Sequence, residues 1–187
     1  MSEFADSLQF LDQDIKAIEA VLQSSGEPSL LLGANDRTVS VLAPWPQRDE
    51  LRLHGKVIDY AYGEDHGIWI KFFNNGKMIG KYVNVWDDDP SDDTEENQPG
   101  VTDELTNVLL ANGFLDDSRA TEFQKFMDEI DPESDDWRAI EKAVDNLGDT
   151  FGFFAHRWVG FAMVDPRFFE EIKDQFPDAK LINVGSP

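Results

Sequence analysis

The chain has 187 residues, with 38 Asp and Glu, 16 Lys and Arg and three His, which gives a formal net charge of −22 at pH 7. It contains no Cys, so disulfides, zinc–thiolate sites, iron–sulfur ligation and a cysteine nucleophile are excluded. With 14 Phe, five Trp and 41% hydrophobic residues, it carries core material that a disordered acidic protein lacks. We therefore expect one folded α+β domain over residues 1–187.

The first 23 residues show the periodicity of an amphipathic helix. Gly26 and Pro28 follow as residues that end helices. The pattern predicts an N-terminal helix over 4–23 that packs on a sheet, with a dimer seam as the alternative, so the oligomeric state stays open. The stripe consists of six apolar residues at steps of three and four: Phe4, Leu8, Leu11, Ile15, Ile18 and Leu22.

The following segment predicts an antiparallel meander, with strands over 29–32, 38–42, 51–62, 68–73 and 77–86. Asn75-Gly76 lies between the last two of these strands. Asn-Gly between two alternating apolar runs is the strongest short signal for a β-hairpin. Within that hairpin, Ile68, Ile70 and Phe72 are expected to share one face of the sheet.

The C-terminal half predicts helices first and a hairpin afterwards. Helices are expected over 102–112, 118–130 and 134–147, with Gly113 and Gly148 closing the first and the third. Strands over 150–155 and 158–164 would form a second hairpin. Asp165-Pro166 would then open a closing helix that runs to residue 175, and the pattern at 181–184 is compatible with a last strand.

The negative charge is concentrated in one region. Residues 87–149 hold 21 Asp and Glu against four Lys and Arg, which is −17 of the total of −22. Some of these acids lie at expected helix starts, where the helix dipole stabilises negative charge by about 0.3–1 kcal/mol each. Seven acids in the polar stretch 87–100 have no such explanation and indicate either a solvated loop or a binding rim: Asp87, Asp88, Asp89, Asp92, Asp93, Glu95 and Glu96.

Neither metal nor nucleic acid is an expected partner. An EF-hand reading of the stretch from Asp87 puts Asp92 at the position that requires Gly. The three histidines show no metal-ligand spacing, and no phosphate-binding glycine loop is present, so no cofactor is expected. A charge of −22 repels nucleic acid and anionic lipid and attracts basic partners. The acids also cluster in connections rather than along helices, which disfavours mimicry of duplex DNA.

These patterns favour a non-catalytic acidic interaction protein, of the inhibitor or immunity type, that binds and blocks a basic protein such as a toxin. The seven acids of 87–96 would form the rim, and Trp86 and Trp137 would be the aromatic anchors. No secretory signal and no apolar run of about 20 residues is present, which favours a cytoplasmic location and no membrane partner.

Two alternatives stay open at this point. One is an enzyme of unknown reaction, in which His156 acts as general base with a neighbouring carboxylate and Arg157 binds an anion. The other is an acidic domain of the halophile type, whose charge is an adaptation to salt and serves no charge-specific partner.

Overall fold

The computed structural model describes residues 4–63, 67–85, 102–129, 137–153, 160 and 164–184. The strands within these residues are β1 (Phe4–Leu11), β2 (Ser29–Ala34), β3 (Thr38–Leu42), β4 (Lys56–Gly63), β5 (Gly67–Asn74), β6 (Lys77–Val85) and β7 (Lys180–Ile182). The helices are α1 (Ile15–Ser25), α2 (Trp45–Leu51), α3 (Thr102–Ala111), α4 (Asp117–Glu129), α5 (Trp137–Phe151) and α6 (Phe169–Gln175). The α+β class expected from the sequence is confirmed.

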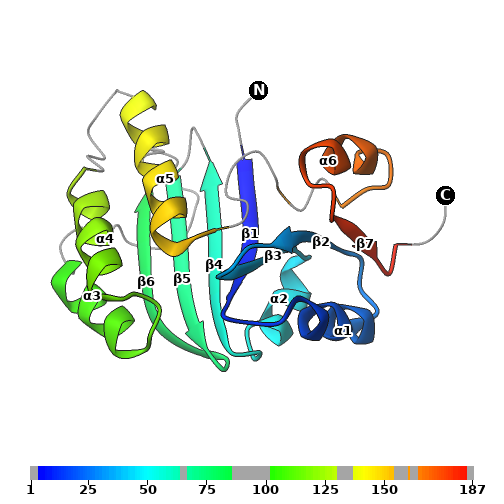
Figure 1. The fold of residues 1–187 in the computed structure, drawn as a ribbon, viewed down its shortest axis with the longest axis horizontal. Coiled ribbons are helices and arrows are strands. Elements are labelled where there is room, and N and C mark those ends of the chain that lie inside the picture. The colour runs from blue at the N-terminus through cyan, green and yellow to red at the C-terminus, as the bar shows by residue number, and fades with distance from the viewer. Residues whose placement is uncertain are drawn as a thin grey trace.

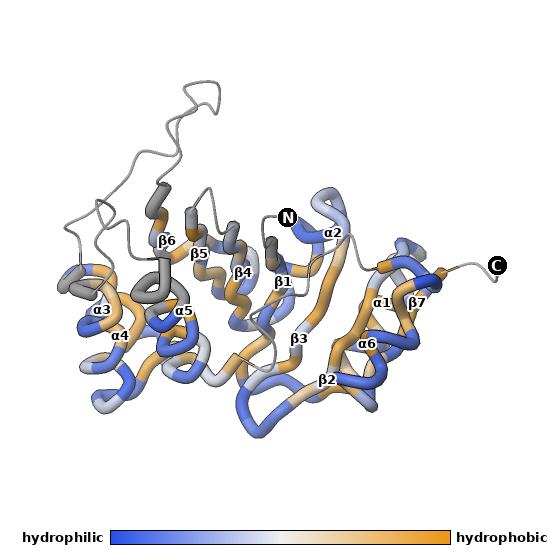
Figure 2. The backbone as a smooth tube through the Cα atoms, turned by 90° about the horizontal axis from the view of Figure 1, so that it is seen from above, coloured by the Kyte–Doolittle hydropathy of each residue, from blue (hydrophilic) through white to orange (hydrophobic). Residues whose placement is uncertain are grey.

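The described strands form one antiparallel sheet in the order β6-β5-β4-β1-β3-β2-β7, with β1 in the middle (Figure 1). Helices cover both of its faces. α3, α4 and α5 lie over β4, β5 and β6, whereas α2 lies on the opposite side of the sheet (Figure 2). We refer to these as the α5 face and the α2 face. α6 shares the α5 face, over β2 and β3, and α1 shares the α2 face.

Aromatic side chains dominate the core of the α5 face. Phe72 of β5 contacts Phe114, Phe123 and Phe151 at ring-centroid distances of 5.7, 6.4 and 5.4 Å. Edge-to-face and tilted pairs of this kind add to the free energy of burial. Ile68 and Ile70 belong to the same cluster as Phe72, as the alternation of the sequence predicts.

The hairpin predicted at Asn75-Gly76 is confirmed. Its residues have φ of 49° and 79°, the left-handed values that a type I′ turn requires. Farther along, the β5–β6 register shifts between Phe72 and Phe73. Ile79 is the extra residue of this bulge, and its side chain packs against the α5-face core.

The helix expected over 4–23 is wrong in its first half. Residues 4–11 form β1, and the helix begins only at Ile15, capped by Asp14, whose carboxylate accepts the backbone N–H groups of Lys16 and Ala17. The reason is that β1 pairs on both edges and is buried on both faces, so it shows no simple alternation. The second half of the prediction holds, since Ile18 and Leu22 of α1 pack on the sheet.

Three other boundaries differ from the predictions. The strand expected over 51–62 is shorter, because Leu51 ends α2 and Gly55, at φ 74°, precedes β4. α5 continues past Gly148 and ends at Phe151, followed by Gly152 at φ 69°, so the hairpin predicted from residue 150 starts inside a helix. The rest of that hairpin falls largely outside the described residues. α6 begins at Phe169 rather than at residue 166.

Candidate functional site

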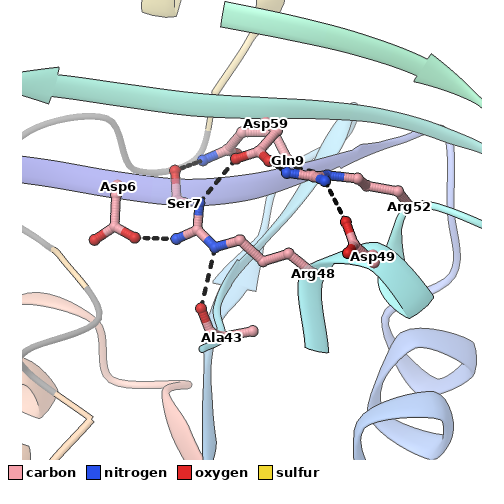
Figure 3. Close-up of polar contacts among 8 residues, drawn as sticks. All are labelled: Asp6, Ser7, Gln9, Ala43, Arg48, Asp49, Arg52 and Asp59. Carbon is pink, nitrogen blue, oxygen red and sulfur yellow. Dashed lines mark hydrogen bonds and ion pairs between the residues drawn. The ribbon is translucent and has the colours of Figure 1, made fainter. Parts of the chain in front are cut away.

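The short helix α2 carries the side chains that connect it to the sheet. Pro44 precedes it and Pro46 lies in its first turn, so the two rings fix φ on either side of Trp45. Trp45, Arg48 and Arg52 are three and four residues apart and therefore lie along one side of the helix and its C-cap. Figure 3 shows the two arginines reaching from this side toward β1 and β4.

Two buried aspartates on neighbouring strands face this helix. Leu8 of β1 is directly opposite Asp59 of β4, and Asp6 lies two residues before Leu8. Residues two apart on a strand project from the same face, so Asp6 and Asp59 are diagonal neighbours on the α2 face. Their exposed fractions are only 4% and 5%. Two carboxylates buried this close together require a cation nearby.

Arg48 supplies that cation from a fully buried position, with 0% of its side chain exposed. Its Nη1 lies 2.8 Å from Oδ1 of Asp59, and its Nη2 pairs with Oδ2 of Asp6. Its Nε donates a hydrogen bond of 3.1 Å to the backbone oxygen of Ala43 (Figure 3). The planar guanidinium therefore spans both carboxylates and also satisfies a carbonyl.

Arg52 completes the arrangement from the end of α2. Its Nε donates to Oδ2 of Asp59 at 3.0 Å, and its Nη1 lies 2.5 Å from Oδ1 of Asp49. Its guanidinium carbon stands 4.7 Å from the ring centroid of Phe73 on β5, a cation–π contact. We call the five charged residues that take part the Arg48 cluster: Asp6, Arg48, Asp49, Arg52 and Asp59.

The Arg48 cluster fixes α2 to the sheet and does not form an open reaction centre. Both carboxylate oxygens of Asp59 accept bonds from arginine, and Arg48 has no solvent-exposed surface, so a substrate has no access to either. At the edge of the Arg48 cluster, buried side chains give way to an exposed one. Trp45 stacks on Arg48, with 4.6 Å from Cζ to the ring centroid, yet 59% of Trp45 is exposed.

The opposite face of β1 carries a second set of buried polar side chains. The side-chain amide of Gln9 donates to Oγ of Ser7 at 2.9 Å, and the hydroxyl of Ser40 on β3 donates to Oε1 of Gln9. All three are at most 3% exposed. Buried polar side chains require hydrogen-bond partners, so this network fixes how β1 and β3 align and does not present reactive groups to solvent.

A third polar group joins the β2–β3 turn to the end of α5. Asn35 Nδ2 and Thr38 Oγ1 donate to the backbone oxygen of Gly152 at 2.8 and 2.6 Å. Arg37 donates to the backbone oxygen of Phe114. Burial lowers the pKa of Arg37, since desolvation disfavours its charged form, and the positive charge of Arg119 acts in the same direction.

Two carboxylates near the surface have perturbed pKa values for local reasons. The pKa of Asp116, just before α4, is lowered first by a hydrogen bond from the backbone N–H of Arg119 and then by that residue's guanidinium. The pKa of Asp165 is lowered by hydrogen bonds from the side chain and backbone of Arg167, and the pKa of Arg167 is raised in return. Both are capping or turn interactions, which account for the shifts without a catalytic role.

The residues predicted to bind a partner lie outside the described part of the chain, apart from Trp137. That residue begins α5, but its side chain is not described. His156 of the enzyme alternative also lies outside, so these hypotheses stay predictions. The undescribed residues of the predicted rim and its adjoining anchor are Trp86, Asp87, Asp88, Asp89, Asp92, Asp93, Glu95 and Glu96.

The described residues show neither a metal cluster nor a bilayer-spanning helix. Nowhere in ranges 4–63, 67–85, 102–129, 137–153 and 164–184 do three or more His, Asp or Glu side chains gather as a metal site would require. In the same ranges, every helix is too short or too polar to cross a bilayer.

Sequence reasoning missed the Arg48 cluster. The pattern assigned Asp6 to a helix, and the cluster appears only once β1 is recognised as a strand. A usable signal was present, because single aspartates interrupt the apolar runs of both β1 and β4, and a buried carboxylate in a strand implies a cationic partner. Which arginine supplies it depends on tertiary contacts.

No protein-family model, curated protein or solved structure shows a significant match to this chain.

Proposed function

We propose that the protein is a non-catalytic acidic interaction protein, of the inhibitor or immunity type, which binds a basic protein and covers its cationic surface. The observation that carries the proposal is the concentration of charge: −17 of the net −22 falls within residues 87–149. Such a field raises the rate at which a positively charged partner arrives and repels anionic ones.

Part of the chain's positive charge is engaged away from the acids of 87–96. At least six of the chain's 16 basic residues already pair with carboxylates. Five of these pairs lie outside residues 87–149, and the sixth joins Arg119 to Asp116 at the start of α4. Even complete one-to-one pairing would leave 22 carboxylates unmatched, which is the formal net charge. The six are Arg48, Arg52, Lys56, Arg119, Arg167 and Lys180.

The test compares the wild type with a variant in which the seven acids of the predicted rim become amides. In that variant Asp87, Asp88, Asp89, Asp92 and Asp93 are replaced by Asn, and Glu95 and Glu96 by Gln. Both proteins are used to capture binders from the native host at low salt. Any basic protein retained only by the wild type is then purified, and its association rate is measured between about 0.05 and 0.5 M salt.

The matched control removes seven exposed acids elsewhere in the described chain. For a steered complex we expect the wild-type association rate to fall at least tenfold over this salt range. The rim variant should associate, even at low salt, at about the rate that the wild type shows at high salt. The control variant should stay closer to the wild type. The proposal is contradicted if the association rate of the binder does not change with salt concentration, or if binding leaves the binder's own activity unchanged. The control positions lie outside residues 87–149 and outside α2: Asp12, Glu27, Asp36, Glu170, Glu171, Asp174 and Asp178.

A further inference from the structure

Trp45 is an exposed aromatic side chain that is held in place before anything binds to it. Pro44 and Pro46 restrict the backbone on both sides, and one part of the ring rests on the guanidinium of Arg48 at 4.6 Å. Arg48 itself is immobilised by Asp6 and Asp59. An aromatic group fixed in this way loses little conformational entropy on binding, which is what makes tryptophan effective as an anchor.

Exposed carboxylates accompany this ring on the same short helix. Asp49 is four residues after Trp45 and therefore lies on the same side of α2, with 79% of its side chain exposed. Glu50 is also exposed, but five residues after Trp45 it projects about 140° farther around the helix, so it adds negative charge without contacting the ring. The Arg48 cluster together with Glu50 contains two arginines and four acids, a formal charge of −2.

We propose that Trp45 and Asp49 form a docking surface for an arginine side chain of a cationic protein segment, with Glu50 adding negative charge on the same helix. This rests on the proposed function, because it names where the basic partner is anchored. A guanidinium stacks on the exposed part of the indole while Asp49, whose Oδ1 already pairs with Arg52, accepts an N–H group with its other carboxylate oxygen. The existing stack of Arg48 on Trp45 shows that this ring accepts a guanidinium in the same geometry.

Other exposed apolar side chains of the described residues lack this combination. Phe168 is 45% exposed, but Arg167, 6.0 Å from its ring centroid, is 82% exposed and presents a positive charge to an incoming guanidinium. By contrast, Arg48 beside Trp45 is buried and paired with two carboxylates. Leu53 and Met78 are 58% and 50% exposed but offer no aromatic surface. Charge complementarity therefore favours the Trp45 surface as the anchor for a basic segment.

The experiment uses hexa-arginine peptide as the probe and the full chain labelled with ¹⁵N at tryptophan. The indole N–H signal of Trp45 is assigned from its disappearance in Trp45→Phe. We expect this signal to shift saturably with added peptide and the shift to weaken as salt is raised. The apparent affinity should fall about two- to fivefold in Trp45→Ala and less in Trp45→Phe.

Matched variants separate this surface from general negative charge. Asp49→Asn/Glu50→Gln removes two adjacent acids from the seven-residue helix α2, and Glu170→Gln/Glu171→Gln removes two from the seven-residue helix α6. We expect only the α2 pair to weaken the shift at Trp45. Phe168→Ala, which removes a comparable exposed ring, should leave hexa-arginine binding unchanged.

The result that overturns the inference is a Trp45 signal that stays fixed while the peptide binds, or equal affinity in the wild type and Trp45→Ala. Self-association that Trp45→Ala abolishes would also overturn it, because the surface would then serve a second copy of the chain. Failure here is distinct from failure of the proposed function. If only this inference fails, neutralising the acids of 87–96 still abolishes salt-dependent binding of the basic partner. If the proposed function fails, neither the acids of 87–96 nor those of α2 affect that binding.

Discussion

Replacing Arg48 by Met should be among the most damaging single substitutions in the described part of the chain. The change removes a side chain that is 0% exposed and leaves Asp6 without its pairing to Arg48 and Asp59 with Arg52 alone. Breaking a buried ion pair from one side costs about 3–5 kcal/mol, since the remaining charge stays buried. With a total stability of about 5–15 kcal/mol for a typical domain, this would be a large fraction.

Urea unfolding followed by circular dichroism measures the effect. We expect the transition midpoint of Arg48→Met to fall sharply with little change in the slope, which would mean that stability and not the unfolded state has changed. Arg48→Lys should recover part of the loss, because it keeps the charge but loses the planar fork that spans two carboxylates.

Arg167→Met is the matched control, since it removes an arginine paired with an aspartate at the surface, where 82% of its side chain is exposed. Exposed pairs contribute about 0–1 kcal/mol, so this variant should be nearly as stable as the wild type. If Arg48→Met also lost less than about 1 kcal/mol, the Arg48 cluster would not be what holds α2 on the sheet.

Three further predictions follow from local geometry. A methyl group at Gly80 would lie 2.4 Å from Cδ1 of Leu105, so Gly80→Ala should cost about 1–3 kcal/mol in urea unfolding, and less when Leu105→Ala is already present. Asp14→Ala removes the acceptor of two backbone N–H groups at 2.8 and 3.2 Å and should cost about 1 kcal/mol, most of which Ser at that position restores. Asp116 should titrate by NMR below its ordinary pKa of 3.8, and Arg119→Ala should leave part of the lowering in place because the backbone N–H remains; a pKa at or above 3.8 contradicts this. Since the folded-state pKa is lowered, the stabilisation from Asp116 is present above pH 3.8 and is lost as pH falls through the folded-state pKa.

Local signals predicted several elements well. The type I′ turn requires two residues that tolerate positive φ, and the Asn75-Gly76 dipeptide meets this requirement, so the turn can be predicted from the sequence alone. α3 and α4 start and end within one residue of the predicted boundaries, because their apolar spacing and the Gly113 stop are also local. The α2 helix was missed, because its side chains point to a sheet whose position the local pattern does not encode.

The predicted site and the observed cluster show the same contrast between features that local sequence reveals and features that depend on tertiary contacts. The acids of 87–96 were singled out from charge alone, and their role stays a prediction. Trp45 was overlooked as an anchor, since an exposed tryptophan and a buried one look the same in a sequence. Its exposure depends on where α2 is held by Arg48, Asp6 and Asp59.

By itself, the sequence determined the composition of the molecule: a cysteine-free chain with ample aromatic core material and a negative charge gathered in one region. These are sums over residues and need no coordinates. Only the tertiary structure decided that residues 4–11 are the central strand and that Arg48 lies between Asp6 and Asp59. The physical reason is that strand pairing and charge burial join residues that are distant in the sequence, such as Asp6 and Arg48, which are 42 positions apart, so the free energy that favours these contacts comes from partners that no local window contains.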